Sequence, residues 1–219
     1  GGRQHACGKE RNMAKRVIPD IVIGRLPVYL RALQFLIAEG RQITSSQELG
    51  DRLGISSAQI RKDLSHFGEF GKQGTGYDIN FLHEQLRTIL KVNSMWDVAL
   101  VGAGNLGKAI ADYGGFKGKG FVIKVIFDNK EDKIGKPMGI DNIPVQPVAE
   151  LGETIKSLGI TVGIIATPAE EAQAIARTMV EAGVKAILNY APITLTVPSN
   201  VRVQYIDPVV GLQRMTYYL

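Results

Sequence analysis

Apolar residues recur at helical spacing in the first third of the chain. Residues 27–40, opened by a proline and closed by a glycine, carry leucines and isoleucine on one face of a predicted helix. A second helix is predicted for residues 45–54, where the Ser45 hydroxyl can cap it while Glu48 bonds back to the cap. A third begins at Ser56 in the same way. Two helices joined by a tight glycine turn predict a helix-turn-helix.

The face of the third helix opposite its apolar stripe is small, polar and basic. It collects Ala58, Gln59, Arg61, Lys62, Ser65 and His66, with Ser57 beside them. Arg can read guanine and Gln can read adenine, while Lys and Ser can hold phosphates. We therefore expect this face to enter the major groove of DNA. A small solvated helical bundle is the alternative, because every amphipathic helix needs a polar side.

A glycine-rich basic hairpin follows. Residues 70–79 place two β-prone flanks around three glycines, which permit a tight turn. Lys72 and Gln73 at its tip, with Tyr77 nearby, are expected near a phosphate or the minor groove. This hairpin is the wing of a winged helix, and it favours DNA binding over the bundle. A further helix over residues 80–92 is expected to lead to the next domain.

The second half opens with a dinucleotide-binding fingerprint. An apolar strand over residues 97–101 runs into a glycine loop, and a helix over residues 108–113 follows. The first glycine allows the tight turn, the second admits a pyrophosphate, and the third lets helix pack on strand. Phosphates are expected on the free N–H groups at the helix start. The candidate loop residues are Gly102, Ala103, Gly104, Asn105, Leu106 and Gly107.

The next strand, residues 121–127, ends in an acid. Asp128 lies 21 residues past Gly107, where a carboxylate accepts hydrogen bonds from ribose hydroxyls and repels a 2′-phosphate. NAD(H) is therefore favoured over NADP(H). Asn129 and Lys130 are neighbouring candidate contacts, and the Lys130 cation softens that preference. A turn residue that caps the loop is the alternative for Asp128.

Strand and helix alternate through the rest of the chain. Strands are predicted at 161–167, 185–190 and 201–206, and a helix at 169–182. Short connections and apolar strands indicate an α/β domain with a parallel, doubly wound sheet of the Rossmann type. Further cofactor candidates follow two strand ends: Thr167, Pro168, Asn189, Tyr190 and Ala191. Helix-start and turn chemistry is an equal alternative for each of them.

Composition and charge agree with a soluble, cytoplasmic chain of one or two domains. The 219 residues are 45% apolar, and the single cysteine excludes an internal disulfide and a cysteine-rich metal site. No apolar run approaches the ~20 residues of a membrane span. Residues 1–90 hold 13 Lys and Arg against 9 Asp and Glu, which indicates an anionic partner for this half; on charge alone an ordinary solvated surface is an equal alternative. Residues 1–12 precede a methionine and are interpreted as an expression leader.

Acid–base catalysts are scarce in the second half. Residues 91–219 contain no histidine, which excludes a histidine catalyst from this domain. Tyr113 and Lys117 form a Y-x-x-x-K pair of the short-chain dehydrogenase kind, but two glycines between them disfavour a shared helical face. We assign no catalytic residue and no metal ligand, and we expect a sensor. An NAD-dependent oxidoreductase with a fused DNA-binding module is the alternative.

An ordered series of motifs resembles the Rex redox-sensing transcriptional repressors. The motifs are residues 61–68 (RKDLSHFG), the wing 71–77, the glycine loop 101–107 (VGAGNLG) and residues 189–192 (NYAP) with Asp207. The resemblance covers residues 17–219. It implies a homodimer that binds a palindromic operator when NAD+ prevails and is released by NADH, so that genes for NADH reoxidation are derepressed.

The resemblance also implies roles for single residues. Arg61 and Lys62 match operator-reading positions, and the wing contacts fall near Lys72 and Gln73. Tyr113 and Asp207 match nicotinamide-sensing positions. Lys130 falls where some members have a second acid, which bears on cofactor selectivity.

Three segments are expected after the leader. They are a winged-helix domain over residues 13–92, a Rossmann dinucleotide-binding domain over 93–206 and a C-terminal helix over 207–219. The last segment is apolar and helix-prone, and on a monomer surface it would be a liability. We expect it to pack, swapped, against the partner subunit of a dimer; a helix that covers its own domain is the alternative.

Overall fold

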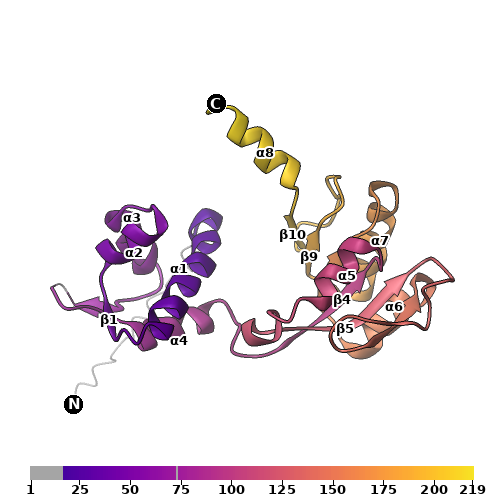
Figure 1. Cartoon of the computed structure of the whole chain (residues 1–219), viewed down its shortest axis with the longest axis horizontal. Coiled ribbons are helices and arrows are strands. Elements are labelled where there is room, and N and C mark those ends of the chain that lie inside the picture. Colours follow the sequence, from indigo (N-terminus) through magenta and orange to yellow (C-terminus); the bar gives the residue numbers. More distant parts are fainter. Residues whose placement is uncertain (1–16, 73) are drawn as a thin grey trace, which may run out of the picture. The chain divides into compact units, whose positions relative to one another are not determined.

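The chain folds as two compact units that divide between Lys91 and Val92 (Figure 1). The computed structural model describes residues 17–72 and 74–219. Gln73 and the expected leader, residues 1–12, lie outside the described residues. The first unit has one hydrophobic core, and the second has two, one on each face of its sheet.

The first unit is a winged helix, as predicted. Its strands form a three-stranded antiparallel sheet in the order β1–β3–β2. Side chains from all four helices share one core, in which Leu33, Leu49, Ile60 and Leu82 are fully buried. The elements are α1 (Asp20–Ala38), β1 (Ile43–Thr44), α2 (Ser46–Leu53), α3 (Ser57–Ser65), β2 (Gly71–Lys72), β3 (Gly76–Asp78) and α4 (Ile79–Ile89).

Helix α1 begins at Asp20, so the predicted start at Pro27 is wrong. Pro27 lies exposed inside the helix, where it forgoes one backbone hydrogen bond. Val22 and Leu26 on the preceding turns are buried, and that burial favours a continuous helix.

By length and composition alone, α1 is also apolar enough to cross a membrane, a test that the core helices of soluble proteins pass as well. Leu33 of α1 is completely buried in the core of this unit.

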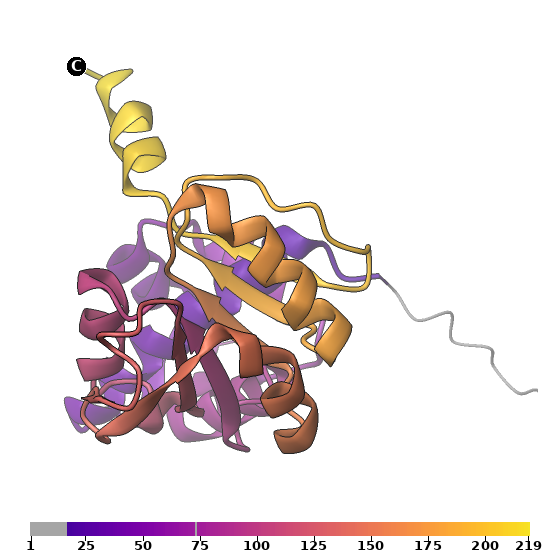
Figure 2. The same cartoon turned by 90° about the vertical axis from the view of Figure 1, so that its right-hand side faces the viewer.

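The second unit is a doubly wound α/β domain (Figure 2), which confirms the predicted Rossmann-type sheet. The strand order is β10–β9–β8–β4–β5–β7–β6, and all neighbours run parallel except β6 and β7. The order reverses beside β4, and such sheets bind ligands at that point. The strands are β4 (Trp96–Val101), β5 (Phe121–Asp128), β6 (Pro137–Met138), β7 (Ile143–Pro147), β8 (Val162–Ile165), β9 (Ala186–Asn189) and β10 (Arg202–Tyr205).

Helices cover both faces of this sheet. Because side chains alternate along a strand, Ala99 and Val101 enter a core with α6 (Leu151–Leu158) and α7 (Ala169–Ala182), while Leu100 enters another with α5. Helix α5 spans Asn105–Asp112, one turn earlier than the pattern predicts. Two single turns of 3-10 helix, Lys117–Lys119 and Val148–Glu150, complete the connections. The last helix is α8 (Pro208–Thr216), and none of its residues is buried.

Candidate DNA interface and nucleotide site

The polar face that the sequence predicts for α3 is largely exposed. Both helices of the pair are capped as expected: Ser45 Oγ accepts the Glu48 N–H at 3.1 Å, and Ser56 Oγ accepts the Gln59 N–H at 3.2 Å. The side chains on the outer side of α3 are exposed, namely Ala58, Arg61, Lys62, Ser65 and His66, whereas Ser57 and Gln59 are half-buried. Small and basic groups are therefore available to a partner along the whole helix.

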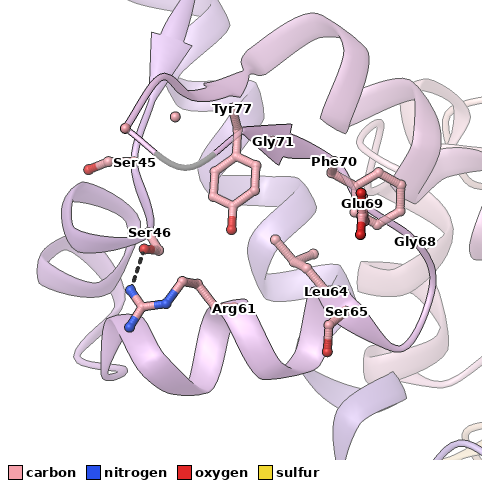
Figure 3. Close-up of a pocket in the computed structure, with 12 residues that line it drawn as sticks. Ser45, Ser46, Arg61, Leu64, Ser65, Gly68, Glu69, Phe70, Gly71 and Tyr77 are labelled. Atoms are coloured by element: carbon pink, nitrogen blue, oxygen red, sulfur yellow. Dashed lines mark hydrogen bonds between the residues drawn. The ribbon is translucent and has the colours of Figure 1, made fainter.

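A cleft of about 900 Å³ separates α3 from the wing (Figure 3). Arg61 points into it from α3, and its Nη1 donates to Ser46 Oγ at 3.0 Å. Tyr77 lines the opposite wall. Burial raises the pKa of the Tyr77 hydroxyl, which the nearby Arg61 charge partly offsets. The cleft thus joins a guanidinium, hydroxyl groups and an un-ionised phenol, all of which can donate to phosphate oxygens.

The wing depends on close backbone contact. Gly76 has φ +79°, and a Cβ there would lie 2.4 Å from the Thr44 carbonyl oxygen. That oxygen belongs to β1, a two-residue strand that the sequence pattern did not predict because it is too short to show alternation. The β2 residue Lys72 pairs with Gly76. Lys72 thus belongs to the wing hairpin, as predicted.

Asp63 is a functional candidate that sequence reasoning missed. It lies on α3 with its side chain fully buried, although an acid between Lys62 and Leu64 suggests an exposed position. Its carboxylate accepts hydrogen bonds from Arg25 and Tyr29 of α1 and from Gln59 of α3. Gln59, predicted to lie on the face that enters DNA, is therefore partly engaged inside the protein.

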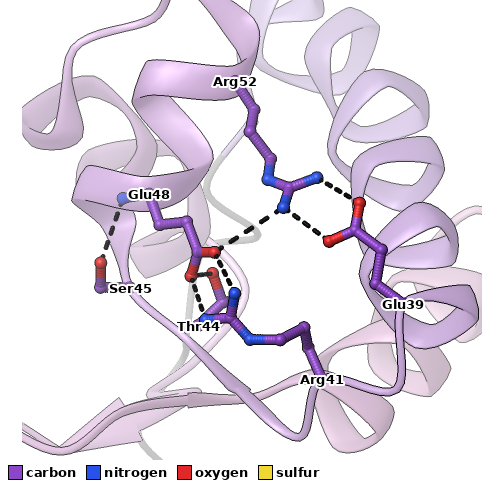
Figure 4. Close-up of polar contacts among 6 residues, drawn as sticks. All are labelled: Glu39, Arg41, Thr44, Ser45, Glu48 and Arg52. Atoms are coloured by element: carbon purple, nitrogen blue, oxygen red, sulfur yellow. Dashed lines mark hydrogen bonds and ion pairs between the residues drawn. The ribbon is translucent and has the colours of Figure 1, made fainter.

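A network of charges ties α2 to the end of α1 (Figure 4). Arg52 Nη2 lies 2.7 Å from Glu39 Oε2, and Arg41 Nη1 lies 3.0 Å from Glu48 Oε1. The Glu48 carboxylate also accepts from the Thr44 hydroxyl. The predicted return of this carboxylate to the helix cap is not found among the described residues, because charged donors bind a carboxylate more strongly than a backbone N–H does. The network fixes α2 beside the first strand of the wing sheet.

The three glycines in the loop between β4 and α5 each have a different environment. Gly102 has φ +109°, and a Cβ there would lie 2.3 Å from the Ala166 oxygen. A Cβ on Gly107 would lie 1.7 Å from the Gly102 oxygen, so α5 packs directly on the loop. Gly104 has open space where its Cβ would point. The first and third glycines are needed by the fold, whereas the second leaves room for a ligand, as the fingerprint predicts.

Asp128 lies at the carboxyl end of β5 and is buried. Its Oδ2 accepts the Ala103 N–H at 2.7 Å and lies 3.3 Å from Lys133 Nζ, while Oδ1 accepts the Lys130 N–H at 2.9 Å. Burial raises the pKa of Asp128, but these donors outweigh it and hold the pKa below its ordinary value. The carboxylate is therefore ionised beside the glycine loop. It also caps the following turn, as the alternative reading proposed.

The residues predicted at the ends of β8 and β9 differ in whether their side chains already have hydrogen-bond partners within the protein. Thr167 has its Oγ1 buried without a hydrogen-bond partner, while its Cγ2 lies beside Gly102. The residue stands between the end of β8 and the Pro168 cap of α7. Asn189 is occupied: its side chain bonds the backbone of Ala191 in both directions at 3.0 Å. Turn chemistry is thus the structural role of the Asn189 side chain, while Tyr190 beyond it is half-buried.

The remaining candidates, Tyr113, Lys117 and Asp207, lie on different elements. Tyr113 ends α5, is half-exposed and stacks edge-on against Phe116 at 5.1 Å between ring centroids. Lys117 belongs to a separate helical turn and pairs with Asp141, so the Y-x-x-x-K pair shares no helix. Asp207 caps α8 by accepting the Val209 N–H at 2.9 Å.

Asn129, beside Asp128, donates to Glu171 of α7 at 2.9 Å. Among residues 17–72 and 74–219 no cluster of three His, Cys, Asp or Glu side chains could hold a metal ion.

Comparisons with known proteins match both units. A family model described as "Putative DNA-binding protein N-terminus" matches residues 17–65, and one described as "CoA binding domain" matches residues 93–193. The redox-sensing transcriptional repressor Rex of Chloroflexus aurantiacus is 52% identical over 92% of this chain and 94% of its own length. The Rex protein of Brevibacillus brevis is 45% identical over 92% of this chain and 97% of its own.

Solved structures agree over both units. RSP in complex with β-NAD+ and operator DNA superposes with a TM-score of 0.86 at 37% identity, covering 92% of each chain. RSP in complex with β-NADH superposes with a TM-score of 0.83 at 35% identity, covering 92% of this chain and 94% of the other.

Proposed function

Because the chain belongs to the Rex family of redox-sensing transcriptional repressors, we propose that it is a homodimer that binds palindromic operator DNA when NAD+ prevails and releases it when NADH binds. One observation carries this proposal. A basic α3 beside a cleft and wing occurs in the same chain as a glycine loop tied to an ionised acid. As a repressor it would act in the cytoplasm.

The first unit supplies the DNA-binding surface. Arg61 and Lys62 would meet base edges or phosphates in the major groove, and the wing at Lys72 and Gln73 would reach an adjacent part of the duplex. Ser65 and His66 extend the exposed face of α3 toward its end. The Arg61 cleft supports an approach by the sugar-phosphate backbone on the side of Arg61, Ser46 and Tyr77, whose side chains can donate hydrogen bonds; Glu69 also lines the cleft and cannot.

The second unit supplies the nucleotide site. The open space at Gly104 and the N–H groups at the start of α5 would hold a pyrophosphate. The ionised Asp128 would accept the ribose hydroxyls and disfavour a 2′-phosphate, so NAD(H) is favoured over NADP(H). Tyr113 and Asp207 would sense the nicotinamide, which carries a positive charge only in NAD+. This chain would bind the nucleotide without turning it over, because residues 91–219 contain no histidine and Tyr113 and Lys117 share no helix.

Helix α8 supports a dimer. Its side chains Val209, Val210, Leu212 and Met215 are all more than half exposed, as is Tyr218 just beyond its end. This exposure is unusual for large apolar groups on one short segment. We take the helix to pack, swapped, against a second copy of the chain and to transmit the nucleotide state to the DNA-binding units. Because a ligand shifts an equilibrium only by its differential affinity, a ~10-fold preference would supply about 1.4 kcal/mol.

Ligand titration tests the proposal. NADH and NAD+ are added separately to the full chain bound to a labelled palindromic duplex, and the bound fraction is followed by fluorescence anisotropy. Release by micromolar NADH, retention with NAD+ and no change in NADH absorbance support the repressor. Equal occupancy with both nucleotides contradicts it, and NADH oxidation with a small carbonyl substrate would instead favour an oxidoreductase.

A further inference from the structure

A buried ionic cluster lies behind the exposed face of α3. The Asp63 carboxylate receives Arg25 Nη2 at 2.8 Å and the Tyr29 hydroxyl at 2.6 Å, both from α1. It also receives Gln59 Nε2, from its own helix, at 2.7 Å. Asp63 has no exposed surface, and Arg25 retains about a quarter of its own. This cluster joins the helix predicted to read DNA to the longest helix of its unit.

The charge state of Asp63 decides which way the Gln59 amide faces. Burial raises the pKa of Asp63, but the hydrogen bonds from Arg25, Tyr29 and Gln59 outweigh it and hold the pKa below its ordinary value. At neutral pH the carboxylate only accepts hydrogen bonds. Gln59 must therefore turn its NH2 group, not its oxygen, toward Asp63. Its Oε1 and its second N–H remain to meet another partner.

We infer that Asp63 is a positioning residue for base recognition: it locks the Gln59 carboxamide so that Oε1 and the remaining N–H are directed to adenine in the operator. A Gln amide matches adenine by accepting from N6–H and donating to N7. Gln side chains lose much rotamer freedom when fixed, and a side chain that is already ordered binds with a smaller entropic penalty. This inference rests on the proposed DNA-binding function.

Base-pair discrimination is the readout that a merely structural role would not change. An operator is first selected from random duplexes by the wild-type chain, and each base pair of its half-site is then substituted in turn. Kd values are measured by anisotropy for wild type, Gln59→Ala, Asp63→Asn and Tyr29→Phe. The last is the matched control, since it removes one hydrogen bond from the same carboxylate on the side of α1 and leaves Gln59 in place.

We expect Gln59→Ala and Asp63→Asn to lose base-pair discrimination at the same position of the operator. Gln59→Ala and Asp63→Asn should both lose discrimination at the same A·T pair, by roughly 5- to 100-fold, while Tyr29→Phe keeps it. Uniformly weaker binding of Asp63→Asn to every duplex, or unchanged discrimination by Gln59→Ala, would overturn the inference. A wild-type chain that selects no operator would instead overturn the proposed function.

Asp63→Asn can fail to fold, so a second measurement uses the wild-type chain alone. In its ¹H–¹⁵N NMR spectrum, the Gln59 carboxamide, assigned by its loss in Gln59→Ala, should show one downfield proton protected from exchange without DNA. Two carboxamide protons at the shifts of a free glutamine, both exchanging rapidly with water, would show that Gln59 is not held in advance and would overturn the inference.

Discussion

The Asp128 carboxylate accepts the backbone N–H of Ala103 at 2.7 Å. This bond links the end of β5 to the glycine loop after β4, two segments that are 25 residues apart in the chain. The residue expected to recognise the ribose therefore also shapes the loop expected to hold the pyrophosphate. Nucleotide selectivity and loop geometry are coupled through one side chain.

Replacing Asp128 should weaken selectivity for NADH over NADPH. In Asp128→Asn a neutral amide no longer repels a 2′-phosphate, and Lys133 loses its charged partner. The Kd for NADPH divided by the Kd for NADH should therefore fall at least ~10-fold. Fluorescence titration of the full chain measures both nucleotides. Glu131→Gln, the same charge change at an exposed neighbour, is the control, and an equal effect there would mean that only general charge matters.

Two alanine substitutions in the glycine loop should separate fold from ligand. Gly107→Ala forces a Cβ against the Gly102 oxygen, so overpacking should destabilise the unit by about 1–3 kcal/mol or more. Gly104→Ala meets open space at φ −77°, so the melting temperature should stay the same or rise while NADH affinity falls at least ~10-fold. Calorimetry and nucleotide titration check the pair. Normal NADH binding by Gly104→Ala would contradict the assigned site.

Acid should weaken the first unit through Asp63. Its pKa is held below the unfolded value of about 3.9, so the stabilisation is complete above about pH 5 and is lost as pH falls through and below the unfolded value. Urea titrations between pH 3 and 7, followed by amide resonances of α1 and α3, measure how the free energy of unfolding of this unit changes with pH. Arg25→Met leaves a buried charge without its ionic partner and should cost about 3–5 kcal/mol at pH 7. A pH-independent midpoint in wild type would contradict the ionic assignment.

Removing the basic side chains of α3 should lower the affinity for operator DNA and leave the affinity for nucleotide unchanged. Arg61→Ala and Lys62→Ala should each weaken operator binding about 10-fold. For whichever of them contacts a phosphate, the slope of log K against log salt should become shallower by about 0.9. Lys156→Ala, an exposed lysine of the second unit, is the matched charge control. If all three variants weaken binding alike, net charge and not α3 sets the affinity.

Helix α8 should hold the dimer together. Leu212→Asp places a charge on an exposed apolar position and should give monomers by light scattering at micromolar concentration. Gln213→Asp adds the same charge at the neighbouring polar position and should remain dimeric. A chain truncated after Asp207 should behave like Leu212→Asp. An undiminished dimer in the truncated chain would leave α8 without the swapped role.

The sequence by itself determined the features that depend on local spacing. Helical periodicity, the Ser45 and Ser56 caps, the glycine loop and the acid at the end of β5 each need only a few neighbouring residues to be recognised. The winged helix and the doubly wound sheet followed from them. The start of α1 was predicted wrongly because Pro27 is a local stop signal, whereas burial of the preceding turns is a property of the folded unit.

Only the tertiary structure decided what the polar residues of α3 do. Asp63 looks like one more charge on an exposed helix until α1 brings Arg25 and Tyr29 to it from 38 and 34 residues earlier. Helical periodicity states which face a residue occupies, but it does not state which distant donors meet that face. Since a charge is buried only where such donors converge, the role of Asp63, and with it the orientation of Gln59, became visible only when the chain was folded.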